Sequence, residues 1–366
     1  MALGKELARY AVLHQRLFGK YHPFLMPRPN ARVRRAIRGT VTDFLRRNKM
    51  PLIDTVAMYI YLTRGGYQQP NRLSAIYGLM WITPKVCKAF ADENIPVVTY
   101  IDSGLISLFD TLIQRFNIDV KLRTNIKRIR RFRNSPNGNV EIQYSRRDDP
   151  FRTFSRYYDF LIVSPPMRNL MNVMDASNKE RKIFNRQITD TYFISSLVDH
   201  PYGIRSDRPN DAFPETLLRY NFEPYASIDI FSMTQNFSGE PYTSGLTPGG
   251  FDGRKVQSSV IYQLGRLDPK IPFVMRDAEN KLWRHMRDKQ RIPYSVVARL
   301  ICPYFTRFSV RDMDRGFIWD VLDLQGQRNT WYIGGSVTFD SAGAVIQYNN
   351  KLLRHYVPPQ RGYILP

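Results

Sequence analysis

The chain has 366 residues, of which 54 are Lys or Arg and 32 are Asp or Glu, so its formal net charge is +22. Its hydrophobic fraction of 43%, with 22 Phe and 22 Tyr, can form a large buried core and excludes a disordered or low-complexity polypeptide. No apolar run reaches the ~18–20 residues of a membrane-spanning helix, and the N-terminus shows no signal peptide. With only Cys87 and Cys302, the sequence favours a soluble intracellular protein without a disulfide framework.

The first hundred residues predict mainly helices. Apolar residues recur at helical spacing over 3–17, and a second stripe over 33–45 predicts another helix that Asn30 caps. Thr83 and Pro84 predict the start of a helix that continues to Phe90, because proline is favoured at the first helical position.

From residue 96 the pattern changes to strands that alternate with helices. The continuously apolar run at 160–163 is typical of a strand covered on both faces. In order, the region predicts a strand at 97–101, a turn at 102–104, a helix at 105–116, and strands at 120–129, 140–144 and 160–163.

The middle of the chain is rich in strand patterns, and its end predicts one strand and one helix. The glycine-rich stretch at 239–253 is typical of a loop. The predicted strands are 192–198, 216–220, 227–231, 256–263, 296–301 and 331–333, and the predicted helices are 277–289 and 343–355.

The positive charge is concentrated in two regions. Residues 1–50 carry twelve Lys or Arg against two acidic residues, and residues 121–156 carry eleven against three. Nucleic acid, an anionic membrane surface and an acidic partner would each be attracted to such regions, and a solvated basic face explains them equally. Because neither zinc-finger spacing nor the aromatic pattern of sheet-based RNA-binding domains occurs, we expect no nucleic-acid partner. The five histidines lack metal-ligand spacing, so we expect no metal site.

Two glycines, Gly334 and Gly335, follow the short C-terminal strand and precede a helix. Glycines at such a place let the backbone approach a ligand, and the N–H groups at the helix start favour an anionic group. Ordinary packing explains a Gly-Gly turn as well, so the turn alone identifies no ligand.

Three sequence blocks, taken in order, resemble the flavin-dependent amine oxidases. The first is Asp102-Ser103-Gly104-Leu105 with the run 120–129, the second is 158–166, and the third is 329–346. The resemblance implies an α/β fold: a partial FAD-binding Rossmann-type domain interleaved with a mixed-sheet substrate domain and a helical region. The implied boundaries are a helical region at 1–95, an FAD-binding-type portion at 96–170 and 325–360, and a β-rich substrate domain at 171–324.

The same resemblance implies a set of site residues. Tyr304 and Phe305 would form an aromatic wall of the substrate pocket, although ordinary core aromatics explain them at least as well. No catalytic residue is identified. The resemblance implies three groups of contacts with FAD. Near the adenosine it places Ile126, Ser164 and Pro165. Near the ribityl–pyrophosphate it places Gly334, Gly335 and Ser336, and near the flavin Ala344, Val345 and Ile346.

The sequence departs from the family at the pyrophosphate site. Its 366 residues contain no G-x-G-x-x-G fingerprint, which in relatives holds the pyrophosphate at a helix N-terminus. We therefore expect FAD binding to be weak or absent in this chain alone. A chain incomplete at its N-terminus, a second chain that supplies the nucleotide-binding unit, and a relative that has lost catalysis all fit this departure.

The sequence therefore leaves two candidate functions. The first is an FAD-dependent oxidoreductase of the amine-oxidase type, which transfers a hydride from an amine or related small organic substrate to the flavin. The second is a non-catalytic basic interaction protein that retains the substrate-domain scaffold and binds an anionic partner.

Overall fold

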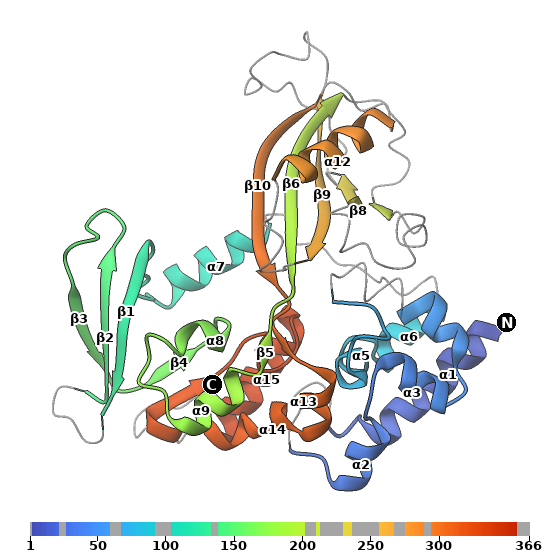
Figure 1. The fold of residues 1–366 in the computed structure, drawn as a ribbon, viewed down its shortest axis with the longest axis horizontal. Helices are drawn as coiled ribbons and strands as arrows, with labels where there is room; N and C mark the ends of the chain where they lie inside the picture. Colours follow the sequence, from blue (N-terminus) through green and yellow to red (C-terminus); the bar gives the residue numbers. More distant parts are fainter. Residues whose placement is uncertain are drawn as a thin grey trace. The chain divides into compact units, whose positions relative to one another are not determined.

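The structure is a computed structural model, and the parts of the chain that it describes form helices and several small sheets (Figure 1). The predicted mixed α/β class is confirmed. The described residues are 2–21, 27–58, 67–91, 104–132, 138–201, 210–212, 230–235, 256–266, 275–288 and 294–356.

The chain divides into two compact units, each built from separated stretches of sequence. Unit 1 comprises Met1–Gly39, Ser74–Gln187 and Phe308–Pro366, and unit 2 comprises Thr40–Leu73 and Ile188–Arg307. Each unit is described by itself below.

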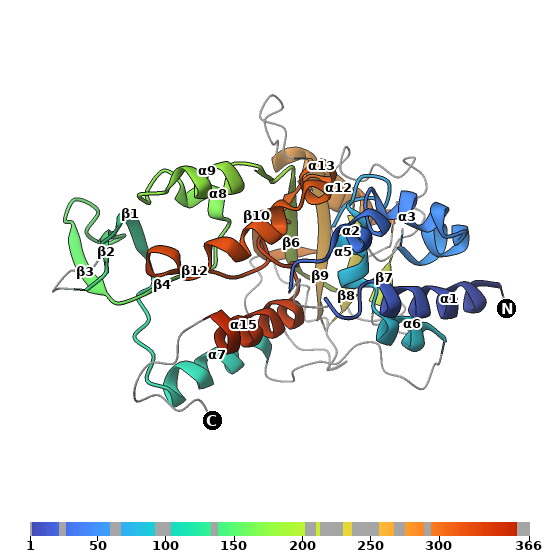
Figure 2. The ribbon, with the colours of Figure 1, turned by 90° about the horizontal axis from the view of Figure 1, so that it is seen from below.

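Unit 1 begins with helices that pack through apolar faces. Helices α1 (Ala2–Leu17) and α6 (Pro84–Ala91) lie side by side (Figures 1 and 2), and α5 (Ala75–Trp81) is buried almost throughout. The hydroxyl of Tyr10 on α1 donates to the carbonyl of Ile82 at 2.9 Å. The helices predicted at 3–17 and 84–90 are thus confirmed.

The stripe predicted as one helix over 33–45 is divided into two. Helix α2 (Ala31–Ala36) is capped by Asn30 as expected, since its side chain accepts from the Val33 amide at 3.0 Å. Gly39 then takes a φ of +84°, which ends the helical path, and Thr40 caps α3 (Val41–Arg47) with a capping box. The single-helix prediction was wrong because helical spacing continues across a break of this kind.

Two sheets and several short helices build the rest of unit 1. Strands β1 (Thr124–Arg131), β2 (Val140–Arg146) and β3 (Phe154–Tyr158) form an antiparallel sheet in that order, and β4 (Leu161–Val163) pairs in parallel with β12 (Thr330–Tyr332). The other elements are α7 (Gly104–Arg115), α8 (Met167–Leu170), α9 (Asn178–Phe184), α13 (Val310–Arg315), α14 (Phe317–Asp320), two short 3-10 helices (Leu322–Leu324 and Gln327–Asn329) and α15 (Ala342–Tyr356).

Strand β4 is not covered on both faces, so that prediction was wrong. Leu161 and Val163 are buried, but the Ile162 side chain between them is 57% exposed. A buried parallel strand is usually covered by helices on both faces of its sheet. In the described residues this sheet has only two strands, and the face that carries Ile162 is open.

The described part of unit 2 contains a five-stranded sheet with helix α12 packed on it, together with α3 and a π-helix (Ile53–Met58) from its first stretch. Its strands run in the order β10 (Ser295–Tyr304), β6 (Thr191–Pro201), β9 (Val256–Arg266), β8 (Ile230–Gln235) and β7 (Asn210–Ala212). All four pairs are antiparallel, whereas the resemblance implies a mixed sheet. Helix α12 (Met275–Asp288) buries Leu282 and Met286 against Val198 and Ile261.

The strands predicted near 192–198, 256–263 and 296–301 and the helix near 277–289 are therefore confirmed. The strands predicted at 97–101 and 216–220 and the loop at 239–253 lie outside the described residues. None of the helices in the described ranges is long and apolar enough to span a bilayer.

Candidate functional site

The loops that follow β4 and β12 meet at one end of their parallel pair. The amide of Ile333 donates to the carbonyl of Val163 at 2.8 Å, which extends the ladder by one residue. Gly334 follows with a φ of +90°, and a Cβ added there would lie 2.5 Å from the Ser164 carbonyl oxygen. The structure therefore brings Ser164 and Gly334 together, and protein packing alone already requires glycine at 334.

Gly335 is also in close contact with a neighbour. A Cβ at this position would lie 2.7 Å from Oδ1 of Asp340, so a larger residue would displace that carboxylate. Burial raises the pKa of Asp340. This partly buried carboxyl therefore lies beside Gly335.

The residues after Gly335 carry buried hydroxyls. Ser336 is 7% exposed and Thr338 is fully buried, and neither hydroxyl has a hydrogen-bond partner within the described part of the chain. The Ser336 carbonyl, in contrast, accepts from Nε2 of Gln187 at 2.7 Å. A buried hydroxyl without a partner costs about 1–3 kcal/mol, so this loop is a candidate for contact with a bound polar group.

The N-terminus of α15 offers a different set of N–H groups from the one expected. The amide of Ala344 donates to Oγ of Ser341 at 3.2 Å, and the amide of Val345 donates to the Ser341 carbonyl at 3.0 Å. No hydrogen bond within the described ranges uses the amides of Ala342 and Gly343, so these two are open to an acceptor. The Ile346 side chain is 58% exposed.

Ile126 lies on β1 beside a β-bulge. It pairs with Tyr144, but the next pair joins Arg128 to Gln143, so Lys127 is the extra residue. A bulge interrupts the ladder and frees main-chain groups locally. The contact of Ile126 with an adenine ring stays a prediction.

Tyr304 and Phe305 belong to unit 2 and pack with Tyr67. The Tyr304 ring stacks on the Tyr67 ring at 6.0 Å, and the Phe305 ring meets the same ring edge-on at 5.0 Å. Phe305 is buried and has a φ of +53°. The described neighbours of Phe305 thus account for its burial by core packing alone.

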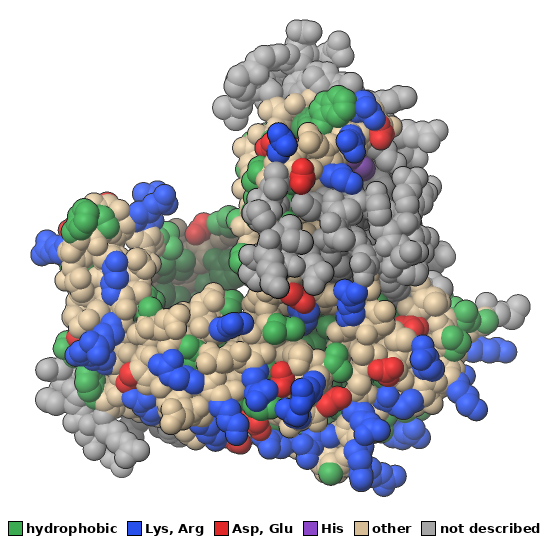
Figure 3. Space-filling view, viewed as in Figure 1, with side chains coloured by type: hydrophobic (Ala, Val, Ile, Leu, Met, Phe, Trp, Pro, Cys, Tyr) green, Lys and Arg blue, Asp and Glu red, His purple; other side chains and the backbone are tan. Residues whose placement is uncertain are grey.

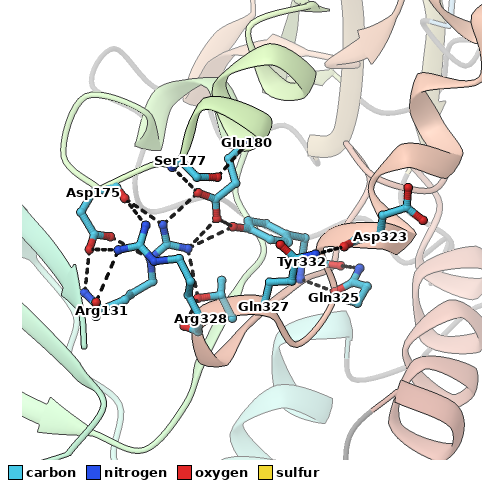
Figure 4. Close-up of polar contacts among 10 residues, drawn as sticks. Arg131, Asp175, Ser177, Glu180, Asp323, Gln325, Gln327, Arg328 and Tyr332 are labelled. Carbon is cyan, nitrogen blue, oxygen red and sulfur yellow. Dashed lines mark hydrogen bonds and ion pairs between the residues drawn. The ribbon is translucent and has the colours of Figure 1, made fainter. Parts of the chain in front are cut away.

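Unit 1 contains a buried network of polar side chains around Arg131, which the sequence did not predict. Arg131, at the end of β1, has a fully buried guanidinium that bonds Glu180 on α9 at 2.6 and 2.9 Å (Figure 4). Its Nε donates to Oδ1 of Asp175 at 2.8 Å, and further contacts of 3.3 Å reach the hydroxyls of Thr330 and Tyr332 on β12. These contacts join β1, α9 and β12.

The ionisation of this network is fixed by its hydrogen bonds. Burial opposes the charged form of Glu180, but hydrogen bonds from Arg131, Tyr332 and the Ser177 amide lower its pKa to about 2. Burial likewise opposes charge on Arg131, yet Glu180 and Asp175 raise its pKa above the ordinary value. Burial and the Glu180 carboxylate raise the pKa of Tyr332. The network therefore holds an ion pair and a neutral phenol, which is a structural arrangement rather than a proton-transfer site.

The outer edge of β12 is closed by the segment before it. The Gln325 side chain accepts from the Tyr332 amide at 2.9 Å and donates to the Tyr332 carbonyl at 2.8 Å (Figure 4), while the amide of Gly326 donates to the Thr330 carbonyl at 2.9 Å. A further strand can therefore add to this sheet only at β4, on the edge away from β12.

No group of three or more His, Cys, Asp or Glu side chains that could hold a metal ion is found among the residues described. Cys87 is buried, and burial raises the pKa of its thiol to about 12, so it is a structural thiol. Cys302 is partly buried.

No protein-family model matches the sequence, and no curated protein matches it. Solved structures do match. A fatty acid isomerase from P. acnes that produces CLA has a TM-score of 0.68 and 18% identity, and the match covers 95% of this chain and 74% of the isomerase.

Two oxidases match at lower similarity. Putrescine oxidase bound to putrescine has a TM-score of 0.52 and 11% identity, with 96% of this chain and 75% of the oxidase covered. A putative protoporphyrinogen oxidase from Exiguobacterium sp. has a TM-score of 0.52 and 10% identity, with 96% and 72% covered. At 18% identity or less, these matches show that the chain shares its fold with the isomerase and the two oxidases.

Replacing Glu180 by Gln should destabilise unit 1 by about 3 kcal/mol, because the buried guanidinium of Arg131 would lose its most buried ionised partner and keep only Asp175. The folded pKa of Glu180, about 2, lies below the value of about 4.3 in an unfolded chain. Its contribution is therefore complete above about pH 5 and is lost as the pH falls toward 2. Urea unfolding at neutral and acid pH measures both effects, and Glu180→Gln should lack this acid-dependent loss.

The matched control is Glu279→Gln, because Glu279 is 54% exposed in an ion pair with Arg299. Surface pairs contribute about 0–1 kcal/mol, so this variant should unfold nearly as the wild type does. Equal stability of the two variants would contradict the role given to Glu180.

Replacing Gly334 by Ala should lower the unfolding free energy by about 2 kcal/mol or more, because the φ is left-handed and the new Cβ meets the Ser164 backbone. Gly343→Ala is the internal control, since a Cβ there meets nothing within 4 Å and the residue lies in a helix. It should be neutral or stabilising by up to about 1 kcal/mol. Thermal unfolding of both variants tests whether Gly334 packs against the Ser164 backbone. Equal melting temperatures of the two variants would refute this contact.

Proposed function

We propose that this chain is an FAD-dependent oxidoreductase of the amine-oxidase type, with unit 1 as the FAD-binding-type part and unit 2 as the substrate domain. The substrate would be an amine or a related small organic molecule that gives a hydride to the flavin. When bound, FAD would supply the electron-accepting chemistry, and the protein would supply binding and orientation.

The observation that carries this proposal is the loop between β12 and α15. Within one continuous segment it combines the left-handed Gly334, the buried unpartnered hydroxyls of Ser336 and Thr338, and the open amides of Ala342 and Gly343. Hydroxyls and helix N-terminal amides are the groups that hold the polar parts of a dinucleotide. This segment lies where the carboxyl ends of two parallel strands meet, a common location for ligands in α/β sheets.

The residues present fit only part of FAD. No G-x-G-x-x-G segment occurs in the 366 residues, so the doubly charged pyrophosphate has no evident cradle here. We propose that a further strand–helix unit, from the same gene product or from a second chain, adds to the edge of β4 away from β12. Such a unit would cover the exposed Ile162 side chain and place a helix N-terminus near Ser164.

The candidate substrates include both amines and fatty acyl chains. Putrescine is the molecule bound in one structural neighbour, and the neighbour with the higher TM-score acts on fatty acids. In unit 2 the rings of Tyr67 and Phe305 are buried, so Tyr304, which is partly exposed, is the member of this aromatic group that could contact an apolar substrate.

The direct experiment is to mix the purified chain with excess FAD, separate free from bound flavin by gel filtration, and record the visible flavin absorption. We expect little or no retained flavin with the chain alone. A chimera carrying a G-x-G-x-x-G strand–helix unit ahead of residue 1 should retain flavin, and putrescine should bleach that flavin in the absence of oxygen. Absence of flavin in both proteins would refute the proposal.

Replacing Ser336 by Ala together with Thr338 by Val should separate ligand contact from burial. Removing two unpartnered buried hydroxyls should raise the stability of the FAD-free protein by about 1 kcal/mol or more. If these hydroxyls bind FAD, the same variant should lose about tenfold or more in flavin affinity in the chimera. Unchanged affinity with raised stability would show that the hydroxyls are merely buried.

One observation favours the second candidate, a non-catalytic basic interaction protein. Helix α2 presents the exposed side chains of Arg32 and Arg35 to solvent, where an anionic partner could bind them. The buried charge of Arg131, in contrast, is paired with Glu180 and Asp175 inside the protein. This candidate requires stable folding without FAD and salt-sensitive retention on heparin. Flavin-dependent turnover by the chimera would exclude it.

A further inference from the structure

One end of the β1–β2–β3 sheet gathers segments that are distant from the buried network. Thr124 at the start of β1 pairs with Arg146 at the end of β2, and the amide of Arg147 donates to the carbonyl of Arg123 at 2.8 Å. The loop from 147 to 153 then leads into β3 at the same end, because Phe154 pairs with Tyr144. In Figure 3 hydrophobic and basic side chains gather on this sheet, at the end drawn uppermost.

Two large apolar side chains at this end are presented to solvent. Phe151, in the loop before β3, is 97% exposed, and Leu122, just before β1, is 80% exposed. Pro150 beside Phe151 is also exposed. Exposing a Phe and a Leu together forgoes the free energy that either would gain by burial. Neither side chain supports the core of the sheet, so they are available to an apolar phase outside the molecule.

Arginines surround these apolar residues. Arg123, Arg146, Arg147 and Arg152 are exposed, and none of them takes part in an ion pair within the described chain. Lys121, in contrast, is neutralised by Asp119 at 2.6 Å. The charge of these four arginines is therefore not balanced by ion pairs at this end of the sheet.

The sheet also orients two of these guanidinium groups. Arg146 and Arg152 lie over the Phe154 ring at 5.0 and 4.9 Å, and that ring stacks on Tyr144 at 5.6 Å. Of the two acidic residues in the loop, Asp149 accepts from the Arg152 amide at 3.3 Å and is thereby held to the loop backbone. Guanidinium groups held in this way are suited to phosphate oxygens.

We propose that this end of the sheet, defined by Leu122, Arg123, Arg146, Arg147, Phe151 and Arg152 and here termed the basic tip, docks onto an anionic lipid bilayer surface. Phe151 and Leu122 enter the boundary between headgroups and acyl chains, while the arginines bind lipid phosphates. Exposed apolar side chains ringed by basic ones are the combination that interfacial binding requires.

Lipid fits the basic tip better than single-stranded nucleic acid does. Nucleic-acid platforms stack bases on aromatic rings spread along a basic groove. Here one of the two exposed apolar residues is the aliphatic Leu122, which offers no ring. The exposed tyrosines of β3, Tyr157 and Tyr158, pair with Glu141 and Val140 and so lie toward the other end of the sheet.

The test is flotation of the 366-residue chain with vesicles of phosphatidylcholine alone and with phosphatidylserine included. We expect about tenfold or greater preference for the anionic vesicles at low salt, reduced as the salt concentration rises. Phe151→Ser with Leu122→Ser should weaken anionic binding by about tenfold or more. Arg123→Gln with Arg147→Gln should weaken it about 25-fold, since each basic residue near such a surface contributes about fivefold.

The matched control carries Val12→Ser and Arg284→Gln, which change an exposed apolar residue and an exposed arginine outside the basic tip. It should bind as the wild type does, and circular dichroism should show the same melting temperature for all the variants. Equal binding to neutral and anionic vesicles, or equal loss in the control, would overturn the proposal. It would also be overturned if the tip variants lost binding to single-stranded DNA while vesicle binding stayed unchanged.

Discussion

The structure of unit 1 depends on the burial of one guanidinium group. A charged side chain removed from water is tolerated only where ion pairs and hydrogen bonds replace its hydration. Arg131 finds these partners in residues 44 to 201 positions away in the chain. Because all of them must be in place together, the arginine fixes the end of β1, the start of α9 and the strand β12 relative to one another (Figure 4).

This arrangement determines where a ligand could bind. It holds β12 in parallel with β4, and the loops at their carboxyl ends then bring Ser164 against Gly334. Gln325 and Gly326 close one edge of the two-stranded sheet, while no described strand pairs with the opposite edge and the Ile162 side chain is exposed. The loop that we propose contacts FAD follows β12 at this same end of the pair.

The charge of the protein has more than one structural role. Arg131 and Arg328 are used inside unit 1, where both bind Asp175. Among the residues that the structure describes, no acidic side chain forms an ion pair with the arginines of the basic tip, which lie beside exposed apolar residues. The same residue type therefore serves internal cohesion at one end of the β1–β2–β3 sheet and an external surface at the other.

The sequence by itself determined most of the local structure and indicated which known proteins share the fold of this chain. Cap residues and apolar spacing identified α1, α6, α12 and the long strands, and three ordered motifs indicated the amine-oxidase type of fold, because these signals depend on neighbours in the chain. Tertiary structure decided the rest. In the run from Thr124 to Arg131, four residues are Lys or Arg, and local pattern cannot show that only Arg131 is buried against distant acids. Likewise, the apolar run at β4 suggested burial, but the exposure of Ile162 follows from which strands and helices are present to cover it.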